Sequence, residues 1–423
     1  MTSLPGTHTG GTLRHEPSAL VSKMALLYVL VLPFDILPLV YGKAITVPVS
    51  LILIFCWTAD KIRWRARIDF PITVGVVMYL YLFWILATTV WSSAPGTTFG
   101  AVATMAAQFL LVVILVDVLP DIWETALKAL ALGTVALALL LLSQPANLER
   151  GGRAGVGVDE NVTAMTLTIG FAAIMYLAVR ASRGWVTGVY FGLVLLVGAG
   201  SVHVGSRTGF LAVAAVLVIG ILPARDRIGR RGRSRMAVRG LVLVAMSLAF
   251  LEVARSAGMV PERILSSFQD AINFDDPGRS DIVQMYLPTI SSWAFAGVGF
   301  GADAYYLQST VGVFRNAHNL FWKTWVEGGA VGLTLFGLLL WLIAKRGMHS
   351  PARSALLLFA APVLLFAMTL GGQQNNILWF VAALALIPPS APCPSRASDD
   401  QLGSRDTGGR GHTTPTRVTR HQA

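Results

Sequence analysis

The sequence has few charged residues and almost no cysteine. Of its 423 residues 13% are charged and 54% are hydrophobic. That charged share is about half of the roughly 25% typical of soluble globular domains. Two cysteines, Cys56 in an apolar stretch and Cys393 in a polar tail, exclude a disulfide framework and a zinc cluster. The scarcity of charge nearly rules out a soluble enzyme and indicates a chain with several membrane spans.

The apolar residues fall into twelve blocks close to the length of a bilayer-spanning helix, roughly 17 to 25 residues. The blocks cover residues 24–42, 45–59, 70–91, 99–116, 126–143, 162–179, 185–202, 208–223, 240–254, 318–344, 354–370 and 377–388. The first, second and last are the weakest. Because no short apolar core with a small-residue cleavage site precedes them, we expect the first block to be a retained helix. The pattern predicts an all-α polytopic membrane protein with about 12 transmembrane helices.

Lysine and arginine gather in alternate connections between the blocks. If the N-terminus lies in the cytoplasm, the inner connections are 60–69, 117–125, 180–184, 224–239 and 345–353. All except 117–125 carry the excess of basic residues expected on the cytoplasmic side. We therefore predict that both termini are cytoplasmic.

The net charge of +11 also allows a reading as a nucleic-acid-binding protein. Residues 224–239 contain seven arginines, and a dense basic stretch beside a membrane attracts RNA or anionic lipid as well as anchoring the topology. The orientation of the chain in the membrane explains the basic residues of the other inner connections as well. We therefore expect contact with membrane lipids and no binding of nucleic acid.

Polar segments flank the apolar region, which extends over residues 24–388. We expect the polar N-terminus, 1–23, and the tail, 389–423, to be disordered and cytoplasmic, because the tail lacks the apolar residues needed to bury a core. Between the ninth and tenth blocks, residues 255–317 include six acidic residues, four arginines and no lysine. We predict that this segment is a large extracytoplasmic loop.

Short helices are predicted inside this loop at residues 261–274 and 280–294, separated by an Asp-Asp-Pro-Gly turn at 275–278. The following stretch, 297–301, reads Gly-Val-Gly-Phe-Gly. It neither follows a βαβ strand nor matches G-x-G-x-x-G, so it is not a dinucleotide fingerprint. We expect a tight loop packed against helix ends.

A few basic residues remain in the predicted outer connections despite the inside preference. They are Lys43, Arg150, Arg153, Arg207, Arg255, Arg263, Arg279 and Arg315. Arg207 opens a span directly after Gly205-Ser206, at a helix N-terminus, where the helix dipole favours anions. An arginine in this place can also reach lipid headgroups, so position alone leaves both roles open.

The tenth block carries three titratable residues near its predicted outer end. His318 lies at its mouth, where an imidazole can accept a proton near pH 7, although headgroup contact or helix capping is the more common role of such a histidine. Lys323 and Glu327 are spaced i, i+4, so they share one helix face and can pair. Pairing offsets the cost of roughly 2.5–3.5 kcal/mol for each charge inside a membrane. We expect this pair to be structural.

Four segments on the predicted outer side form a set. The first holds Gly152-Arg153 and then Glu160-Asn161, and the second is Gly-Ser-Arg-Thr-Gly at 205–209. The third runs from Gly278-Arg279 through Pro288 to 297–301, and the fourth runs from His318-Asn319 to Gly332-Leu333. In this order and in a twelve-span frame they resemble the O-antigen ligase and polysaccharide polymerase superfamily of bacterial membrane glycosyltransferases. Two details depart from the family pattern: Glu160 stands where proline or asparagine is usual, and Thr208 replaces a small residue.

The resemblance covers roughly residues 20–390 and implies a reaction. A glycan would pass from an undecaprenyl-diphosphate carrier to an acceptor hydroxyl at the extracytoplasmic face of the bacterial inner membrane, without a metal or other cofactor. The acceptor would be a glycan or a lipid-linked glycan, since ligases transfer to lipid A-core and polymerases join repeat units. The motifs do not separate ligase from polymerase.

The chemistry of such a transfer suggests roles for individual residues. Without a metal, arginines must neutralise the diphosphate, since they pair bidentately with phosphate oxygens and stay charged. Arg207 and Arg279 are the best candidates, and His318 is the candidate base for the acceptor hydroxyl in an inverting displacement. The further candidates for substrate binding are Arg153, Arg263, Arg315, Asn161 and Asn319.

Two alternatives remain open. Asp275 and Asp276, with Asp270 and Asp281 nearby, could bind a divalent cation. A capped turn before a helix with Pro277 in its first turn explains them more simply. A transporter or flippase of lipid-linked oligosaccharide would also show about twelve spans and a few buried charges. The sequence shows no convincing internal repeat and no P-loop, which favours an enzyme.

Overall fold

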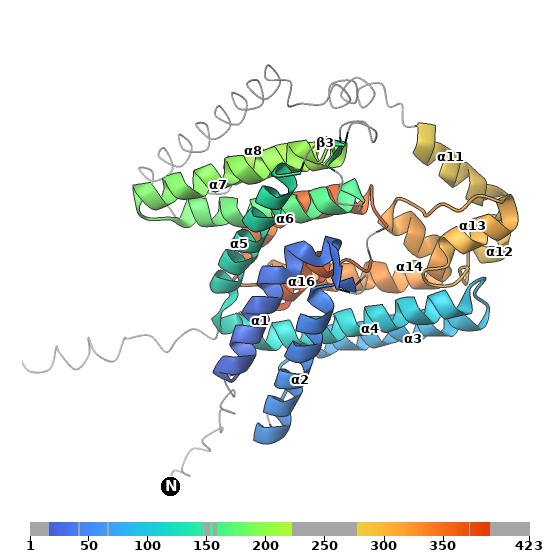
Figure 1. Cartoon of the computed structure of the whole chain (residues 1–423). Helices are drawn as coiled ribbons and strands as arrows, with labels where there is room; N and C mark the ends of the chain where they lie inside the picture. Colours follow the sequence, from blue (N-terminus) through green and yellow to red (C-terminus); the bar gives the residue numbers. More distant parts are fainter. Residues whose placement is uncertain are drawn as a thin grey trace, which may run out of the picture. The chain divides into compact units, whose positions relative to one another are not determined.

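The computed structural model describes residues 17–40, 43–65, 67–144, 146–147, 153–154, 159–221, 277–371 and 373–389. Its α-helices are α1 (Ala19–Val31), α2 (Thr46–Trp64), α3 (Ile72–Ala87), α4 (Pro95–Val118), α5 (Trp123–Leu142), α6 (Glu160–Arg180), α7 (Gly184–His203), α8 (Arg207–Ile221), α11 (Pro277–Tyr286), α12 (Ile290–Trp293), α13 (Asp303–Val311), α14 (Leu320–Gly347), α15 (Arg353–Ala367) and α16 (Asn376–Leu386). Short 3₁₀ helices are η1 (Leu32–Ile36), η2 (Thr88–Val90), η3 (Leu119–Asp121) and η5 (Leu287–Thr289). Two small antiparallel hairpins pair β1 (Pro38–Val40) with β2 (Lys43–Ala44) and β3 (Ala146–Asn147) with β4 (Arg153–Ala154). The described part of the chain is therefore almost entirely helical (Figure 1).

Seven helical stretches in the described ranges are long and apolar enough to cross a membrane. They are Ala19–Ile36, Ile72–Val90, Pro95–Asp121, Trp123–Leu142, Glu160–Arg180, Gly184–Ser201 and Leu320–Gly347. Three further apolar helices, in α8, α15 and α16, are shorter. The prediction of an all-α membrane protein is confirmed, whereas the count of twelve spans stays a prediction.

Eleven of the twelve predicted blocks contain a helix, and the block at 240–254 lies outside the described residues. The first helix begins at Ala19, where Ser18 Oγ accepts a hydrogen bond from the N–H of Val21 at 3.4 Å. The last five residues of the segment 1–23, which we expected to be disordered, are thus helical, because a capping serine starts the helix earlier. The tail beyond residue 389 lies outside the described part.

In the predicted outer loop, the second short helix is present as the succession α11, η5 and α12. It begins at Pro277, because proline suits the first turn of a helix. The first predicted loop helix, at 261–274, lies outside the described residues. Helix α13 was not predicted from the sequence.

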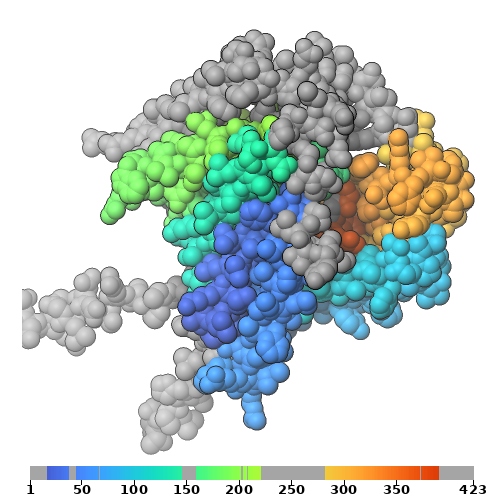
Figure 2. Space-filling model, viewed as in Figure 1, coloured from blue at the N-terminus to red at the C-terminus, as the bar shows by residue number. Residues whose placement is uncertain are grey.

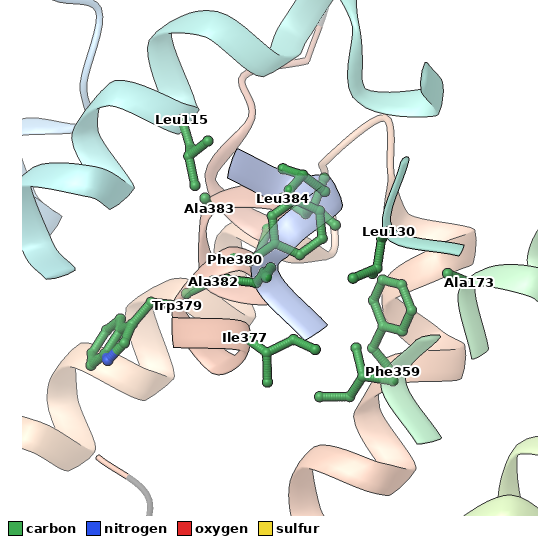
Figure 3. Close-up of a cluster of buried hydrophobic side chains, with 14 of the residues drawn as sticks. Leu115, Leu130, Ala173, Phe359, Ile377, Trp379, Phe380, Ala382, Ala383 and Leu384 are labelled. Atoms are coloured by element: carbon green, nitrogen blue, oxygen red, sulfur yellow. The ribbon is translucent and has the colours of Figure 1, made fainter. Parts of the chain in front are cut away.

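Helix α16 is surrounded by the other helices. Phe380 is fully buried, and Trp379 packs edge-on against Phe109 of α4 with 4.9 Å between the ring centroids. Side chains from α4, α5, α6 and α15 gather around it (Figure 3). A helix that is apolar on all sides is stable where every face is covered. With 11 residues α16 is too short to span a bilayer by itself. Its apolar composition is explained by this packing against other helices.

Ion pairs connect helix ends that the pattern of basic residues predicts to lie on the cytoplasmic side of the membrane. Lys61 near the end of α2 and Asp117 near the end of α4 form a buried pair, with Lys61 Nζ 2.7 Å from Asp117 Oδ2. Trp57 Nε1 donates to the same oxygen at 2.9 Å. Glu124 of α5 and Arg180 of α6 pair at 2.7 Å. The acidic connection 117–125, the exception in the basic pattern, therefore meets basic partners from the connections on either side of it.

Candidate active site

Two of the motif segments meet where α6 and α8 begin. Asp159 caps α6, since its Oδ1 accepts from the N–H of Asn161 at 2.8 Å. Ser206, which is 3% exposed, precedes α8 and donates from its Oγ to Asn161 Oδ1 at 2.9 Å. The same Oγ accepts from the N–H of Gly209 at 3.2 Å, as a helix-capping serine does. Asn161, a predicted substrate-binding residue, thus also joins the two helix starts.

Glycines on either side of Ser206 allow this arrangement. Gly205 has a φ of 76°, in the left-handed region that favours glycine. At Gly209 a Cβ atom would lie 2.7 Å from the Cβ of Ala164 in α6, closer than side-chain carbons approach one another. The motif around Arg207 therefore encodes a turn, a cap and a close helix crossing, with the arginine at the first helical position.

Three predicted site residues, Arg153, Asn161 and Arg207, have their backbones at the same end of the group of helices α5 to α8. Arg207 is the first residue of α8, and Arg153 lies in β4, which pairs with β3 after α5. The base of that hairpin meets the end of α7, because His203 Nε2 lies 3.3 Å from the carbonyl oxygen of Gln144. Asn161 lies in the first turn of α6 at the same end. Two helix starts therefore meet there, with Asp159 and Ser206 as their caps.

Helix α11 carries Arg279 in its first turn. At its other end Tyr286 OH donates to the main-chain oxygen of Asp303 at 3.1 Å. Burial, together with the negative charge of Asp303 and Glu327, raises the pKa of Tyr286 well above its ordinary value. The hydroxyl therefore stays protonated and can donate. Arg263 lies outside the described residues.

His318 is half-buried and lies directly before α14. The next residue, Asn319, caps this helix, since its Oδ1 accepts from the N–H groups two and three residues later at 2.9 and 3.0 Å. Its Nδ2 donates to the carbonyl oxygen of Met368, just beyond α15, at 3.3 Å. Asn319, a predicted substrate-binding residue, thus holds the backbone on one side of His318, and Arg315 is exposed three residues earlier.

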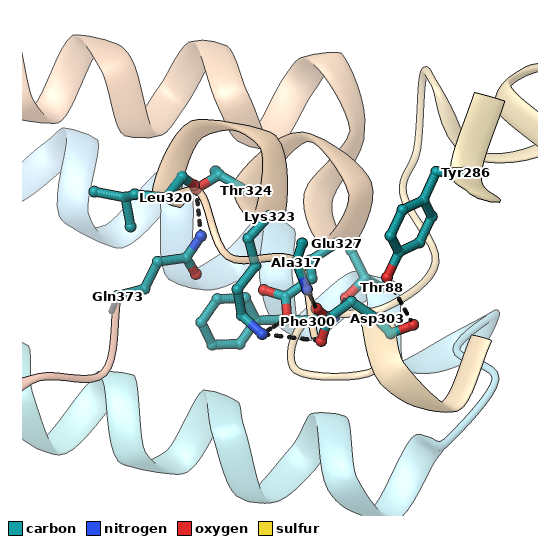
Figure 4. A network of polar contacts seen from close by, with 10 residues as sticks. All are labelled: Thr88, Tyr286, Phe300, Asp303, Ala317, Leu320, Lys323, Thr324, Glu327 and Gln373. Carbon is teal, nitrogen blue, oxygen red and sulfur yellow. Dashed lines mark hydrogen bonds and ion pairs between the residues drawn. The ribbon is translucent and has the colours of Figure 1, made fainter. Parts of the chain in front are cut away.

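Lys323 and Glu327 form the predicted pair, and the structure adds a third residue to it. Lys323 Nζ lies 2.9 Å from Glu327 Oε1 and 2.9 Å from Oδ1 of Asp303 in α13 (Figure 4). Both carboxylates are 1% exposed, so one ammonium lies between two buried acids. The other oxygen of Asp303, Oδ2, accepts from the N–H of Ala317 at 2.8 Å. Sequence reasoning did not single out Asp303, whose one available signal is its position two residues after the glycine-spaced loop.

Helix α14 is interrupted at Gly329, whose φ of 66° and ψ of −169° are readily adopted only by glycine. The glycine-spaced loop binds the interrupted turn, since the N–H groups of Val298 and Gly299 donate to the carbonyls of Val326 and Glu327 at 2.9 and 3.1 Å. The expectation of a tight loop packed against helix ends is thus confirmed. The loop also contacts the turn between α3 and α4, since Trp91 Nε1 donates to the carbonyl of Gly297 at 3.1 Å and the N–H of Phe300 donates to Thr88 Oγ1 at 3.1 Å. Figure 2 shows the orange part of the chain, which includes this loop, against the cyan part, which includes α3 and α4.

Two more bonds satisfy the backbone around the interruption. Trp84 Nε1 of α3 donates to the carbonyl of Gly328 at 2.7 Å. The N–H of Ala330 donates to the carbonyl of Ala294 at 2.8 Å. Since a bilayer offers no partners for free backbone groups, a broken membrane helix needs such partners from the protein. The break is therefore a supported feature of α14, located two residues after Glu327.

Helix α15 connects the two groups of candidate residues. It packs on α8, and a Cβ at Gly220 near the end of α8 would lie 3.8 Å from Cδ2 of Leu358 near the start of α15. The two helices are thus antiparallel, and at about 1.5 Å per residue the start of α8 lies about one turn beyond the end of α15. Because Asn319 contacts Met368 just beyond that end, the backbones of Arg207 and His318 lie at the same end of the bundle.

A family model described as O-antigen ligase matches residues 191–337. This segment of the chain is thus similar to an O-antigen ligase domain. The match confirms the resemblance to the O-antigen ligase and polymerase superfamily, and with the apolar helices it indicates a membrane protein of glycosyltransferase type. The matched segment includes Arg207, Arg279, His318, Lys323 and Glu327, whereas Arg153 and Asn161 precede it. No curated protein matches the chain in sequence.

Proposed function

We propose that the protein transfers a glycan from an undecaprenyl-diphosphate carrier to an acceptor hydroxyl at the extracytoplasmic face of the bacterial inner membrane. One observation carries the proposal. The matched segment, 191–337, contains the start of α8 with Arg207, helix α11 with Arg279 and the capped start of α14 beside His318. The acceptor is either a growing glycan chain or a lipid-linked core glycan.

The distribution of charge supports a reaction at the extracytoplasmic face. Lys61 lies near the end of α2 and Arg180 at the end of α6, whereas Arg207 begins α8 and His318 precedes α14. The basic pattern predicts that the ends of α2 and α6 are cytoplasmic, which supports an extracytoplasmic site at the starts of α8 and α14. Outside the cytoplasm nucleotide sugars and ATP are not supplied, so the donor must arrive already activated. A sugar on a lipid diphosphate meets that requirement.

In the proposed step the acceptor hydroxyl attacks the anomeric carbon of the donor sugar. Its proton passes to the imidazole of His318 as the new C–O bond forms. The bond from the anomeric carbon to the phosphate oxygen breaks, and its electron pair stays on the diphosphate. Arg207 and Arg279 stabilise that developing charge, and their bidentate geometry suits phosphate oxygens. Attack opposite the leaving group inverts the anomeric configuration.

The test is turnover by the purified protein in lipid nanodiscs with an undecaprenyl-diphosphate-linked oligosaccharide and candidate acceptors. Arg207→Ala and His318→Ala should each abolish most of the activity. Matched controls are Arg346→Ala and His349→Ala, two exposed residues at the other end of α14, which should leave it intact.

The products distinguish the remaining possibilities. A ladder of longer lipid-linked glycans identifies a polymerase, and a single capped acceptor identifies a ligase. Retention of the anomeric configuration contradicts the single displacement. Oligosaccharide that crosses the bilayer without any covalent product contradicts the proposal and identifies a transporter.

A further inference from the structure

We infer that Asp303 is a positioning residue that holds His318 in place for the transfer, and that the ion pair with Lys323 holds Asp303 itself. The inference rests on the proposed function. Asp303 is 1% exposed and lies in the first turn of α13, fifteen residues before the histidine. Among the contacts of the described residues, none joins Asp303 directly to His318. Asp303 acts through the peptide N–H of Ala317, the residue directly before His318.

The carboxylate of Asp303 faces two donors, one at each oxygen. Oδ1 accepts from Lys323 Nζ at 2.9 Å, and Oδ2 accepts from the N–H of Ala317 at 2.8 Å. An ionised carboxylate is acceptor-only, so both oxygens can be used at once. Asparagine would present one oxygen and one NH₂ group, so one of the two donors would face another donor. The arrangement thus requires an acid here.

His318 is consequently held from both sides. Before it, the N–H of Ala317 is bound to Asp303, and after it, the side chain of Asn319 caps α14 and contacts Met368. Lys323, one turn into α14, ties Asp303 to the helix that His318 precedes. A general base must be held within a few tenths of an ångström of its working position, and supporting hydrogen bonds supply that constraint.

Asp303 also connects this segment to the helix that carries Arg279. Its main-chain oxygen accepts from Tyr286 OH at the end of α11. Arg279 lies in the first turn of the same helix, seven residues before Tyr286. Asp303 therefore joins the segments of the proposed base and of one proposed phosphate-binding arginine.

The test compares Asp303→Asn with Asp117→Asn, which likewise removes a carboxylate from a buried pair with lysine but at the opposite end of the helices. We expect Asp303→Asn to lower kcat by on the order of 10- to 100-fold, because small misplacements of a catalytic group have effects of this size, with little change in KM for the lipid-linked donor. Asp117→Asn should lower the melting temperature but leave kcat unchanged. Asp303→Glu, which keeps both acceptor oxygens, should recover part of the loss.

A second readout does not depend on activity. Diethyl pyrocarbonate modifies accessible imidazoles, and the exposed His349 serves as an internal reference in the same molecule. The rate of modification of His318 relative to His349 should rise in Asp303→Asn and stay at the wild-type value in Asp117→Asn. An unchanged ratio together with an unchanged kcat would overturn the inference.

Two outcomes separate this inference from the proposed function. If the wild-type protein transfers no glycan but Asp303→Asn still changes the modification of His318, the proposed function fails and the positioning role stands. If Asp303→Asn lowers kcat as strongly in a His318→Ala background as in the wild type, the effect does not pass through His318 and the positioning role is wrong. A residue that acts through the histidine should add no further loss there.

Discussion

Ser206 Oγ lies 2.9 Å from Asn161 Oδ1, and this hydrogen bond joins the starts of α6 and α8 across 45 residues of sequence. The same hydroxyl caps α8 at its first turn. The position of Arg207, the next residue, is therefore set by a side chain that has no part in the proposed chemistry.

Ser206→Ala should lower the free energy of unfolding by about 1 kcal/mol through loss of the cap. It should also reduce turnover, because the start of α8 loses its connection to α6. Thermal unfolding and turnover in nanodiscs measure the two effects. The matched control is Ser201→Ala in α7, whose buried hydroxyl donates within its own helix, to the carbonyl of Val197. Equal turnover in both variants would contradict the prediction.

Gly329→Ala should destabilise the protein strongly, since the backbone conformation costs about 1–3 kcal/mol for a residue with a Cβ. The added Cβ would also overlap the carbonyl oxygen of Phe295. The yield of folded protein and its melting temperature are the measurements. Gly337→Ala, in the same helix but with open space around the new Cβ, should be neutral or slightly stabilising.

Removing Lys61 should show the cost of breaking a buried ion pair. Lys61→Met should lower the free energy of unfolding by roughly 3–5 kcal/mol, because Asp117 then loses its ammonium partner inside the protein. The double variant Lys61→Met with Asp117→Asn should regain part of that stability, since the amide oxygen can still accept from Trp57. A double variant less stable than Lys61→Met alone would refute this account.

Replacing the proposed phosphate-binding arginines by lysine should test their geometry separately from their charge. Arg207→Lys and Arg279→Lys should each lower kcat on the order of 10²-fold, since lysine keeps the charge but cannot pair bidentately with a diphosphate. Arg346→Lys at the other end of α14 is the matched control and should turn over normally. Full activity in both test variants would remove the arginines from the proposed step.

Chelation should leave turnover unchanged, because the proposed stabilisation of the diphosphate comes from arginines. The measurement is transfer activity before and after dialysis against EDTA. A loss that Mg²⁺ or Mn²⁺ restores would instead favour a divalent cation, with the Asp275-Asp276 turn, which lies outside the described residues, as the first place to look.

The sequence predicted the helices well because a membrane span has a strong compositional signal. It also predicted the Lys323–Glu327 pair, since the i, i+4 spacing fixes which side chains share a helix face. The last apolar block was among the weakest predicted membrane spans. In the structure it forms the short helix α16, which neighbouring helices cover on every side.

Other features had no such local signal. Asp303 joins Lys323 across 20 residues, and neither its neighbours nor its spacing mark it as a partner. The break at Gly329 was also missed, since a Gly-Gly pair inside an apolar block is compatible with an uninterrupted helix. The roles of Arg207, Arg279 and His318 stay predictions, supported by the position of their backbones and by the matched family.

The interruption of α14 limits how this protein can be recombined with others. The carbonyls of Val326 and Glu327 depend on the N–H groups of residues 298 and 299, which belong to the segment before α14. An exchange of that segment for another protein's loop would leave these buried carbonyls without their donors unless the first turns of α14 were exchanged with it. Chimeras designed to alter the transferred sugar should therefore place their junctions before α11 and after Gly329, so that loop and helix are inherited as one unit.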